Sequence, residues 1–224
     1  MNTIPKEALV FLDKLKKNNN REWFAENKEE FKQIENQMKL FYSEVEKLMK
    51  KHDDILDFKA YRIYRDIRFS KDKTPYKSHF SAHFARKKPE LRGGYYLHIE
   101  PEGNSFLAAG FWNPVKEDVL RVRKEWDLDT TEIRKIVTNK NFVKTWGQME
   151  GEKLKTAPSG FSKDHPDIGL INYKQWYFLH PFTDPEILSD DFAINVNQCY
   201  KKIRPFFDYM SEVLTTDLNG VSLI

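Results

Sequence analysis

"GGYYLHIEPEGNSFLAAGFWN", residues 93–113, contains two short aromatic-rich stretches on either side of the turn residues Glu102-Gly103-Asn104. Short runs of this composition, separated by glycine and asparagine, are typical of consecutive antiparallel strands. Two upstream stretches have the same character, FKAYRIYRDIRF (58–69) and KSHFSAHFA (77–85). The four stretches together predict a meander of four strands.

Helical patterns lie on both sides of this strand region. Before it, a short pattern ends near Asn18. A second one starts at the N-cap residue Asn20, has apolar residues at spacings of three, four or seven, and predicts a long helix that would reach Lys51 if unbroken. After it, Asn113 begins a central helical segment, and an apolar pattern over 188–213 predicts a long C-terminal helix.

Helices, then strands, then helices define the α+β class. We expect an antiparallel sheet of about four to six strands, formed by residues of about 58–112 plus a strand near 174–181. The sheet should pack against long N- and C-terminal helices and a central helical segment. Since no repeat, low-complexity tract or linker divides the chain, we predict a single domain over residues 1–224.

Composition and missing motifs exclude several classes of protein. No apolar run approaches the roughly 20 residues of a membrane span, and no signal sequence is recognisable, so we expect a cytoplasmic protein that does not bind membranes. The lone Cys199 cannot form an internal disulfide and fits a buried helical position. The chain lacks a glycine-rich phosphate loop, paired cysteines, HExxH and GxSxG. We therefore assign no cofactor, metal or reaction.

Charge is concentrated in one part of the chain. From Lys59 to Lys88 there are ten Lys or Arg and two Asp, a net of +8. Because the whole chain carries +3, the remaining residues carry −5. A local field of this kind attracts anions, unless acidic residues elsewhere neutralise it within the fold.

The stretch "YRIYRDIRFSKDKTPYK", residues 61–77, contains the candidate site. We predict that a phosphate or carboxylate group is held by five cationic side chains, Arg62, Arg65, Arg68, Lys73 and Lys77, with four supporting residues, Tyr64, Asp66, Tyr76 and His79. If 58–69 is a strand, Arg65 falls on its apolar side and needs a bulge, a carboxylate or a bound anion. Asp66 would either orient an arginine or act as an acid or base, and the alternative for the tyrosines is packing in the sheet.

Histidines in the strand region offer a second type of site. His79 and His83 share one side of a strand, but their Cα atoms would be about 13 Å apart, too far to bind one metal ion. His98 and Glu100 are closer on a strand face and would form a site with a histidine from a neighbouring strand. The alternative is that they are satisfied polar residues on an exposed sheet face.

Four strings resemble those of the family catalogued as domain of unknown function 2461: RIYRDIRFSKDKTPYK, GGYYLHIEP, AGFWNP and FSKDHPDIGLINYKQWYF. The resemblance extends from the long N-terminal helix to the aromatic strand near Trp176. It implies a cytoplasmic single-domain α+β protein and supplies no reaction, ligand or catalytic residue. Gly169 departs from it, since an acidic residue is expected at that place.

Three functions are compatible with these observations. The first is binding, with or without turnover, of an anionic small molecule by the basic cluster. The second is binding of nucleic acid, in which tyrosines stack on bases among the cations. The third is a structural or protein-interaction role with the arginines in internal ion pairs. We favour the first, because the cations are confined to one turn and its flanks. The sequence does not predict an oligomeric state.

Overall fold

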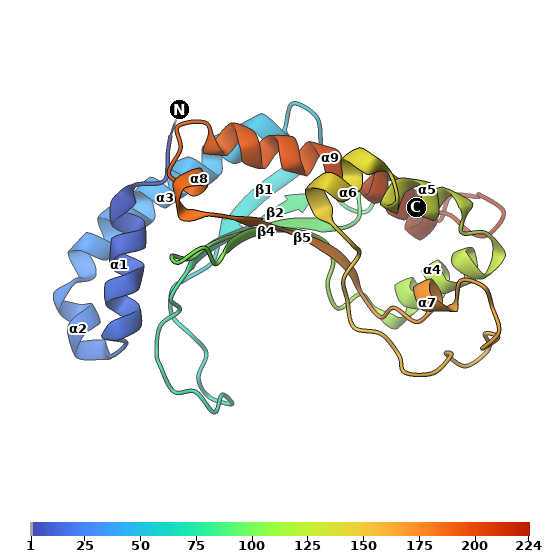
Figure 1. The fold of residues 1–224 in the computed structure, drawn as a ribbon, viewed down its shortest axis with the longest axis horizontal. Coiled ribbons are helices and arrows are strands. Elements are labelled where there is room, and N and C mark those ends of the chain that lie inside the picture. Colours follow the sequence, from blue (N-terminus) through green and yellow to red (C-terminus); the bar gives the residue numbers. More distant parts are fainter. Residues whose placement is uncertain (1) are drawn as a thin grey trace. The chain divides into compact units, whose positions relative to one another are not determined.

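The computed structural model describes residues 2–224 and confirms the α+β class (Figure 1). The helices are α1 (Lys6–Lys17), α2 (Arg21–Glu26), α3 (Lys28–Met49), α4 (Lys116–Leu128), α5 (Thr131–Val137), α6 (Lys140–Trp146), α7 (Ile168–Ile171), α8 (Asp184–Ile187) and α9 (Phe192–Thr215). The strands are β1 (Ile55–Ala60), β2 (Phe80–Arg86), β3 (Gly94–Ile99), β4 (Ser105–Phe111) and β5 (Trp176–Phe182). They form an antiparallel sheet in the order β1-β2-β3-β4-β5, which includes the strand expected near 174–181.

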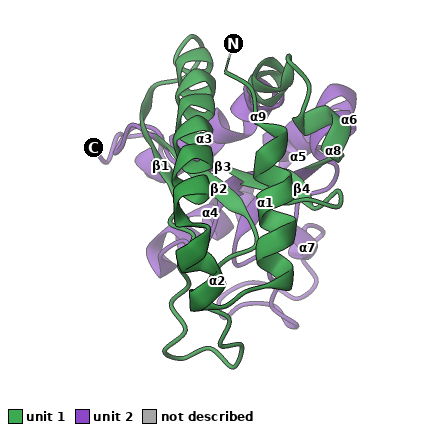
Figure 2. Cartoon of the chain, turned by 90° about the vertical axis from the view of Figure 1, so that its left-hand side faces the viewer, with its two compact units in different colours: residues 1–85, 96–107, 181–198 green, residues 86–95, 108–180, 199–224 purple. Residues whose placement is uncertain are grey.

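The chain divides into two compact units, coloured separately in Figure 2. Unit 1 comprises Met1–Ala85, Tyr96–Leu107 and Pro181–Gln198; unit 2 comprises Arg86–Tyr95, Ala108–His180 and Cys199–Ile224. Strands β2 to β5 and helix α9 each contribute residues to both units. The single domain over 1–224 stays a prediction.

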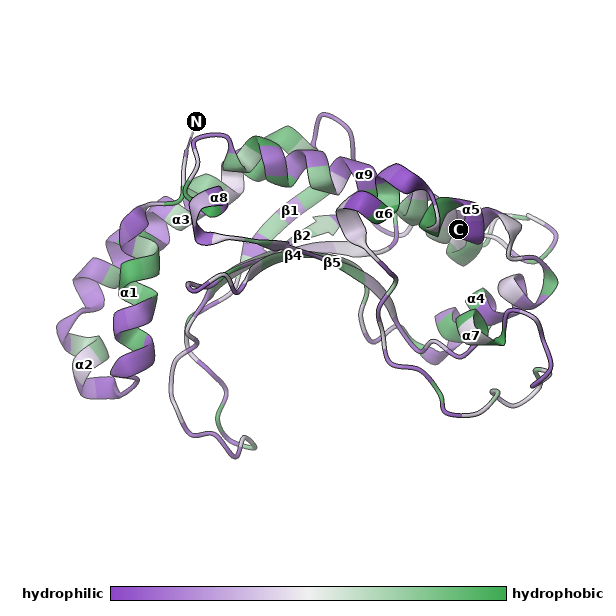
Figure 3. Cartoon of the chain, in the orientation of Figure 1, coloured by the Kyte–Doolittle hydropathy of each residue, from purple (hydrophilic) through white to green (hydrophobic). Residues whose placement is uncertain are grey.

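The core of unit 1 is built from aromatic side chains of the N-terminal helices. Phe31 of α3 contacts Phe11 of α1, with 5.8 Å between the ring centroids, and stacks on Phe80 of β2 at 6.0 Å. Further along α3, Phe41 stacks on Phe192 at 5.6 Å. Hydrophobic and hydrophilic residues alternate along these helices, as Figure 3 shows for α1 and α3, so the periodic apolar positions become the buried ones.

The core of unit 2 contains a second aromatic cluster. Phe207 of α9 meets Tyr95 and Phe111 edge to face, with ring centroids 4.9 Å and 5.8 Å away. Trp126 of α4 contacts Trp176 of β5 at 5.7 Å, and both indoles are fully buried. Large rings of this kind contribute much of the apolar surface that stabilises a core.

Two sequence predictions about the elements are wrong in detail. The long helix expected from Asn20, which would reach Lys51 if unbroken, is divided into α2 and α3 at Asn27. Asn20 does cap α2 by accepting from the backbone N–H of Trp23, but the Asn27 side chain donates to the carbonyl oxygen of Trp23 at 2.8 Å and ends the first helix there.

The strand expected over 58–69 ends at Ala60. Residues 61–79, which we call the basic loop, connect β1 to β2 and form one isolated bridge, between Tyr64 and Tyr76. A regular hairpin is disfavoured here because Pro75 has no N–H to donate and because the cationic side chains would face one another across the strands. The loop is mostly hydrophilic in Figure 3.

None of the helices within residues 2–224 combines the length and the apolar character that a membrane crossing requires.

Candidate functional site

The tip of the basic loop is held by a cluster around Arg65. Its guanidinium donates to the Asp72 carboxylate and to the hydroxyl of Thr74, and more weakly to the Thr74 carbonyl at 3.3 Å. Asp72 also accepts from the Thr74 backbone N–H at 2.9 Å. That hydrogen bond, followed by the one from Arg65, lowers the pKa of Asp72 to about 2. We expected a bulge, a carboxylate or a bound anion to accommodate Arg65, and the structure shows a carboxylate partner, Asp72.

Arg68 is paired inside the loop as well. Its Nε and one terminal nitrogen donate to the two oxygens of Asp66, at 2.9 Å and 2.7 Å. This two-pronged contact lowers the pKa of Asp66 and raises that of Arg68. Of the two roles predicted for Asp66, orienting an arginine or acting as an acid or base, this contact corresponds to the first. Lys73 donates to the carbonyl oxygen of Ile67 at 3.0 Å.

Arg62 and Lys77 are placed differently from the other three cations. Within residues 2–224, neither side chain forms an ion pair or a hydrogen bond, whereas the other three cations each have a partner in the loop. Lys77 is half-buried, and its ammonium lies 5.3 Å from the ring centroid of Tyr61. Burial, and next the positive charge of Arg62, lower the pKa of Lys77. Neither charge is cancelled by an ion pair, although Arg62 is close enough to Asp66 to lower the pKa of that carboxyl.

The predicted tyrosines pack against α2. Tyr76 stacks on Phe24 with 4.0 Å between the ring centroids, and Tyr64 meets the same ring at 5.7 Å. The backbone of Tyr76 is also fixed by Asn19, whose side chain accepts from its N–H at 3.1 Å and donates to its carbonyl oxygen at 3.0 Å. These contacts anchor the base of the loop to the N-terminal helices.

A polar cluster lies where the basic loop enters β2. His79 precedes β2, His98 lies in β3, and Glu100 follows β3 by one residue. One ligand atom from each of these three residues lies within 4.8 Å of the other two. The two imidazole rings pack with centroids 4.1 Å apart and a tilt of 32°.

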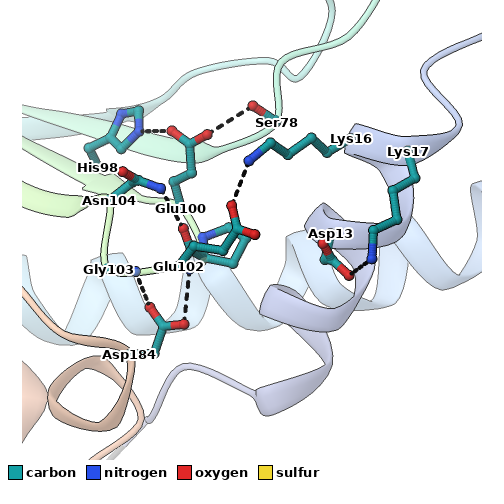
Figure 4. A network of polar contacts seen from close by, with 11 residues as sticks. Asp13, Lys16, Lys17, Ser78, His98, Glu100, Glu102, Gly103, Asn104 and Asp184 are labelled. Carbon is teal, nitrogen blue, oxygen red and sulfur yellow. Dashed lines mark hydrogen bonds and ion pairs between the residues drawn. The ribbon is translucent and has the colours of Figure 1, made fainter.

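Two neighbouring hydroxyls orient this cluster. Ser78 donates to one oxygen of Glu100 at 3.1 Å, and the other oxygen lies 2.9 Å from Nε2 of His98 (Figure 4). On the far side of the His98 ring, Nδ1 lies 3.2 Å from the hydroxyl of Tyr96. Tyr96 also bonds with the side chain of Ser81, which is buried.

The same region is connected to α1 through the turn between β3 and β4. Lys16 forms an ion pair with Glu102 at 2.6 Å, and the backbone N–H groups of Glu102 and Gly103 donate to Asp184 at 3.0 Å and 2.9 Å (Figure 4). Gly103 has a φ of 72°, which suits glycine, whereas the φ of 67° at Glu102 is uncommon for a residue with a side chain. The strand end that carries Glu100 is therefore held on both sides.

The electrostatics of the cluster favour neutral imidazoles. Burial lowers the pKa of His79 to about 4, and the neighbouring His98 acts in the same direction. Burial also lowers the pKa of His98, although Glu100 opposes the shift. Lys77 lowers both values, which places its charge close to the two rings. Neutral imidazoles beside a carboxylate are suited to binding a metal ion.

Sequence reasoning identified part of this cluster. It placed His98 and Glu100 together with a histidine from a neighbouring strand, and His79 takes that place. It missed Tyr96 and Ser78. The signal for Tyr96 was available, since residues 96, 98 and 100 are spaced by two and share one face of a strand. Ser78 has no such signal, because its contact with Glu100 depends on how the loop meets the sheet.

Comparison with known proteins identifies a family. Residues 7–209 match the model of a family described as conserved hypothetical protein, DUF2461. No curated protein and no solved structure matches the chain.

Proposed function

The chain belongs to the conserved hypothetical protein family DUF2461, whose description names no reaction, and from the geometry of its site we propose that it binds an anionic small molecule in the cytoplasm. The ligand is a phosphate or carboxylate compound. One observation carries this proposal: the positive charge of Arg62 lowers the pKa of Lys77, and within the described chain no carboxylate forms an ion pair with either residue.

Two like charges at close range disfavour each other, and partial burial of Lys77 adds a desolvation cost. An anion placed between them would remove the repulsion and accept hydrogen bonds from both groups. Arg65, Arg68 and Lys73 have a different part in the proposal. Because each already has a partner within the loop, they shape it and contribute positive field at longer range.

A cytoplasmic location is part of the same proposal. Cys199 is buried and is the single cysteine of the sequence, so the chain has no internal disulfide, which agrees with a reducing compartment.

The test is a thermal-shift screen of the purified protein with inorganic phosphate, phosphorylated metabolites and carboxylated metabolites, all with a chelator present. A ligand at a hundredfold excess over its dissociation constant adds about 2.7 kcal/mol to the free energy of unfolding. Arg62→Ala and Lys77→Ala should abolish the shift. Lys71→Ala is the matched control, since it removes an exposed cation from the same loop and should leave the shift unchanged.

Two results would contradict the proposal. One is a shift of equal size in the wild type, Arg62→Ala and Lys77→Ala. The other is the absence of any shift together with tight binding of a single-stranded oligonucleotide that weakens steeply with salt, because that behaviour is characteristic of a nucleic-acid-binding module.

A further inference from the structure

We propose that His79, His98 and Glu100 bind a divalent first-row transition-metal ion such as Zn²⁺. Their ligand atoms lie within 4.8 Å of one another. Zinc binds histidine nitrogen and carboxylate oxygen at about 2.0 to 2.2 Å, so two donors on one ion are roughly 3.3 Å apart at tetrahedral angles. Side-chain rotations that move the most distant donors by about 1.5 Å would therefore complete the site.

The backbone positions of the three donors are well suited to this role. His98 and Glu100 are two residues apart and point to the same side of β3. His79 immediately precedes β2, the hydrogen-bonded neighbour of β3. His98 lies in β3, and the other two donors are the residues directly next to β2 and β3, so the sheet holds all three more precisely than a free loop would.

The surroundings of the His79 ring are a second observation in favour of a metal site. Its side chain is half-buried against the ring of His98, yet neither of its ring nitrogens hydrogen-bonds to any residue of the described chain. These nitrogens are not among the fully buried atoms that lack a partner, so solvent reaches them and they are available as ligands. A metal ion between His79, His98 and Glu100 would bind one of them.

The surrounding hydrogen bonds have the pattern of a second shell. Ser78 holds one oxygen of Glu100, and Tyr96 lies at Nδ1 of His98. Oε2 of Glu100 and Nε2 of His98 are left facing each other at 2.9 Å, where a bound ion would separate them. Supporting contacts of this kind fix the ring orientation of metal ligands.

The donor set determines the class of ion. Two imidazoles and one carboxylate suit zinc, iron, cobalt or nickel, whereas calcium and magnesium prefer oxygen ligands. Three protein ligands leave a coordination position for water or another oxygen ligand, as catalytic zinc sites do. A divalent ion with Glu100 carries a net charge of +1, so that position favours an anion.

This inference goes beyond the proposed function and does not depend on it, since the metal is expected to bind without an anionic ligand. The test is a titration of chelator-treated protein with Co²⁺, followed by visible absorption, with Zn²⁺ as competitor and metal content measured after gel filtration. The wild type should bind one equivalent per chain, and Zn²⁺ should displace Co²⁺.

His79→Gln and Glu100→Gln should each weaken Co²⁺ binding by more than about tenfold. His79→Gln removes no hydrogen bond made within the described chain, so it is expected to stay folded even if Glu100→Gln does not. His83→Gln is the control, because His83 lies four residues further along in β2 and should retain wild-type affinity. Wild-type protein that binds no stoichiometric Co²⁺, or a folded His79→Gln variant with wild-type affinity, would overturn the proposal.

Discussion

Tyr96→Phe tests the proposed metal site without removing a ligand. The substitution keeps the aromatic ring and deletes a hydroxyl that lies 3.2 Å from Nδ1 of His98 and also bonds with Ser81. In the metal-free protein, Nε2–H of His98 donates to Glu100, and Nδ1 accepts from Tyr96. When Nε2 binds a metal ion, Nδ1 carries the proton and donates a hydrogen bond. The hydroxyl of Tyr96 is able to accept this hydrogen bond, whereas a phenyl ring is not.

The expected magnitudes follow from these two contacts. Loss of a second-shell partner weakens metal affinity by about 10- to 100-fold, which is about 1.4 to 2.7 kcal/mol of binding free energy. In the absence of metal, each lost hydrogen bond costs about 0.5 to 1.5 kcal/mol, so the free energy of unfolding should fall by about 1 to 3 kcal/mol. The variant should therefore fold and bind Co²⁺ weakly.

The assay combines urea denaturation of the metal-free protein with the Co²⁺ titration. Tyr61→Phe is the matched control, since its ring lies 6.1 Å from that of Tyr96 and its hydroxyl makes no hydrogen bond within the described chain. It should resemble the wild type in both measurements. A folded Tyr96→Phe variant that binds Co²⁺ within about twofold of the wild type would refute the second-shell role argued for this tyrosine.

Two further predictions concern the loop and the sheet. The Thr74 backbone N–H holds the pKa of Asp72 at about 2, so the stabilisation of the loop tip should be complete above the ordinary carboxyl pKa and lost as the pH falls through about 2. Amide hydrogen exchange at Thr74 would measure this loss, and protection that does not change with pH would contradict the prediction. Gly110→Ala should lower the free energy of unfolding, measured by urea denaturation, by about 1 to 3 kcal/mol, because the new Cβ would lie 2.3 Å from the carbonyl oxygen of Trp176. Gly169→Ala is the control: its Cβ meets no described atom within 4 Å, so this variant should be as stable as the wild type.

Local patterns in the sequence were sufficient to predict the class of fold and most of its elements. Both stretches of residues 93–113 become strands, β3 and β4, and Glu102 and Gly103 adopt the turn between them. These features depend on residues that are neighbours along the chain. Period-two and helical patterns, turn residues and the Asn20 cap are properties of that kind, so a single sequence contains them.

The basic loop shows where local patterns stop being informative. The alternation of residues in 58–69 resembled a strand, but the ion pair between Arg65 and Asp72 and the pair between Arg68 and Asp66 form within an irregular loop. A count of charges does not reveal which of them are neutralised, because pairing depends on distances that the path of the loop sets.

The candidate metal site was likewise only half visible in the sequence. The spacing of His98 and Glu100 predicted that they share a face of one strand, and this is a local property. The sequence did not choose between His79 and His83 as their partner. That choice depends on the register of β2 against β3, and register is decided by packing of the whole sheet against the core.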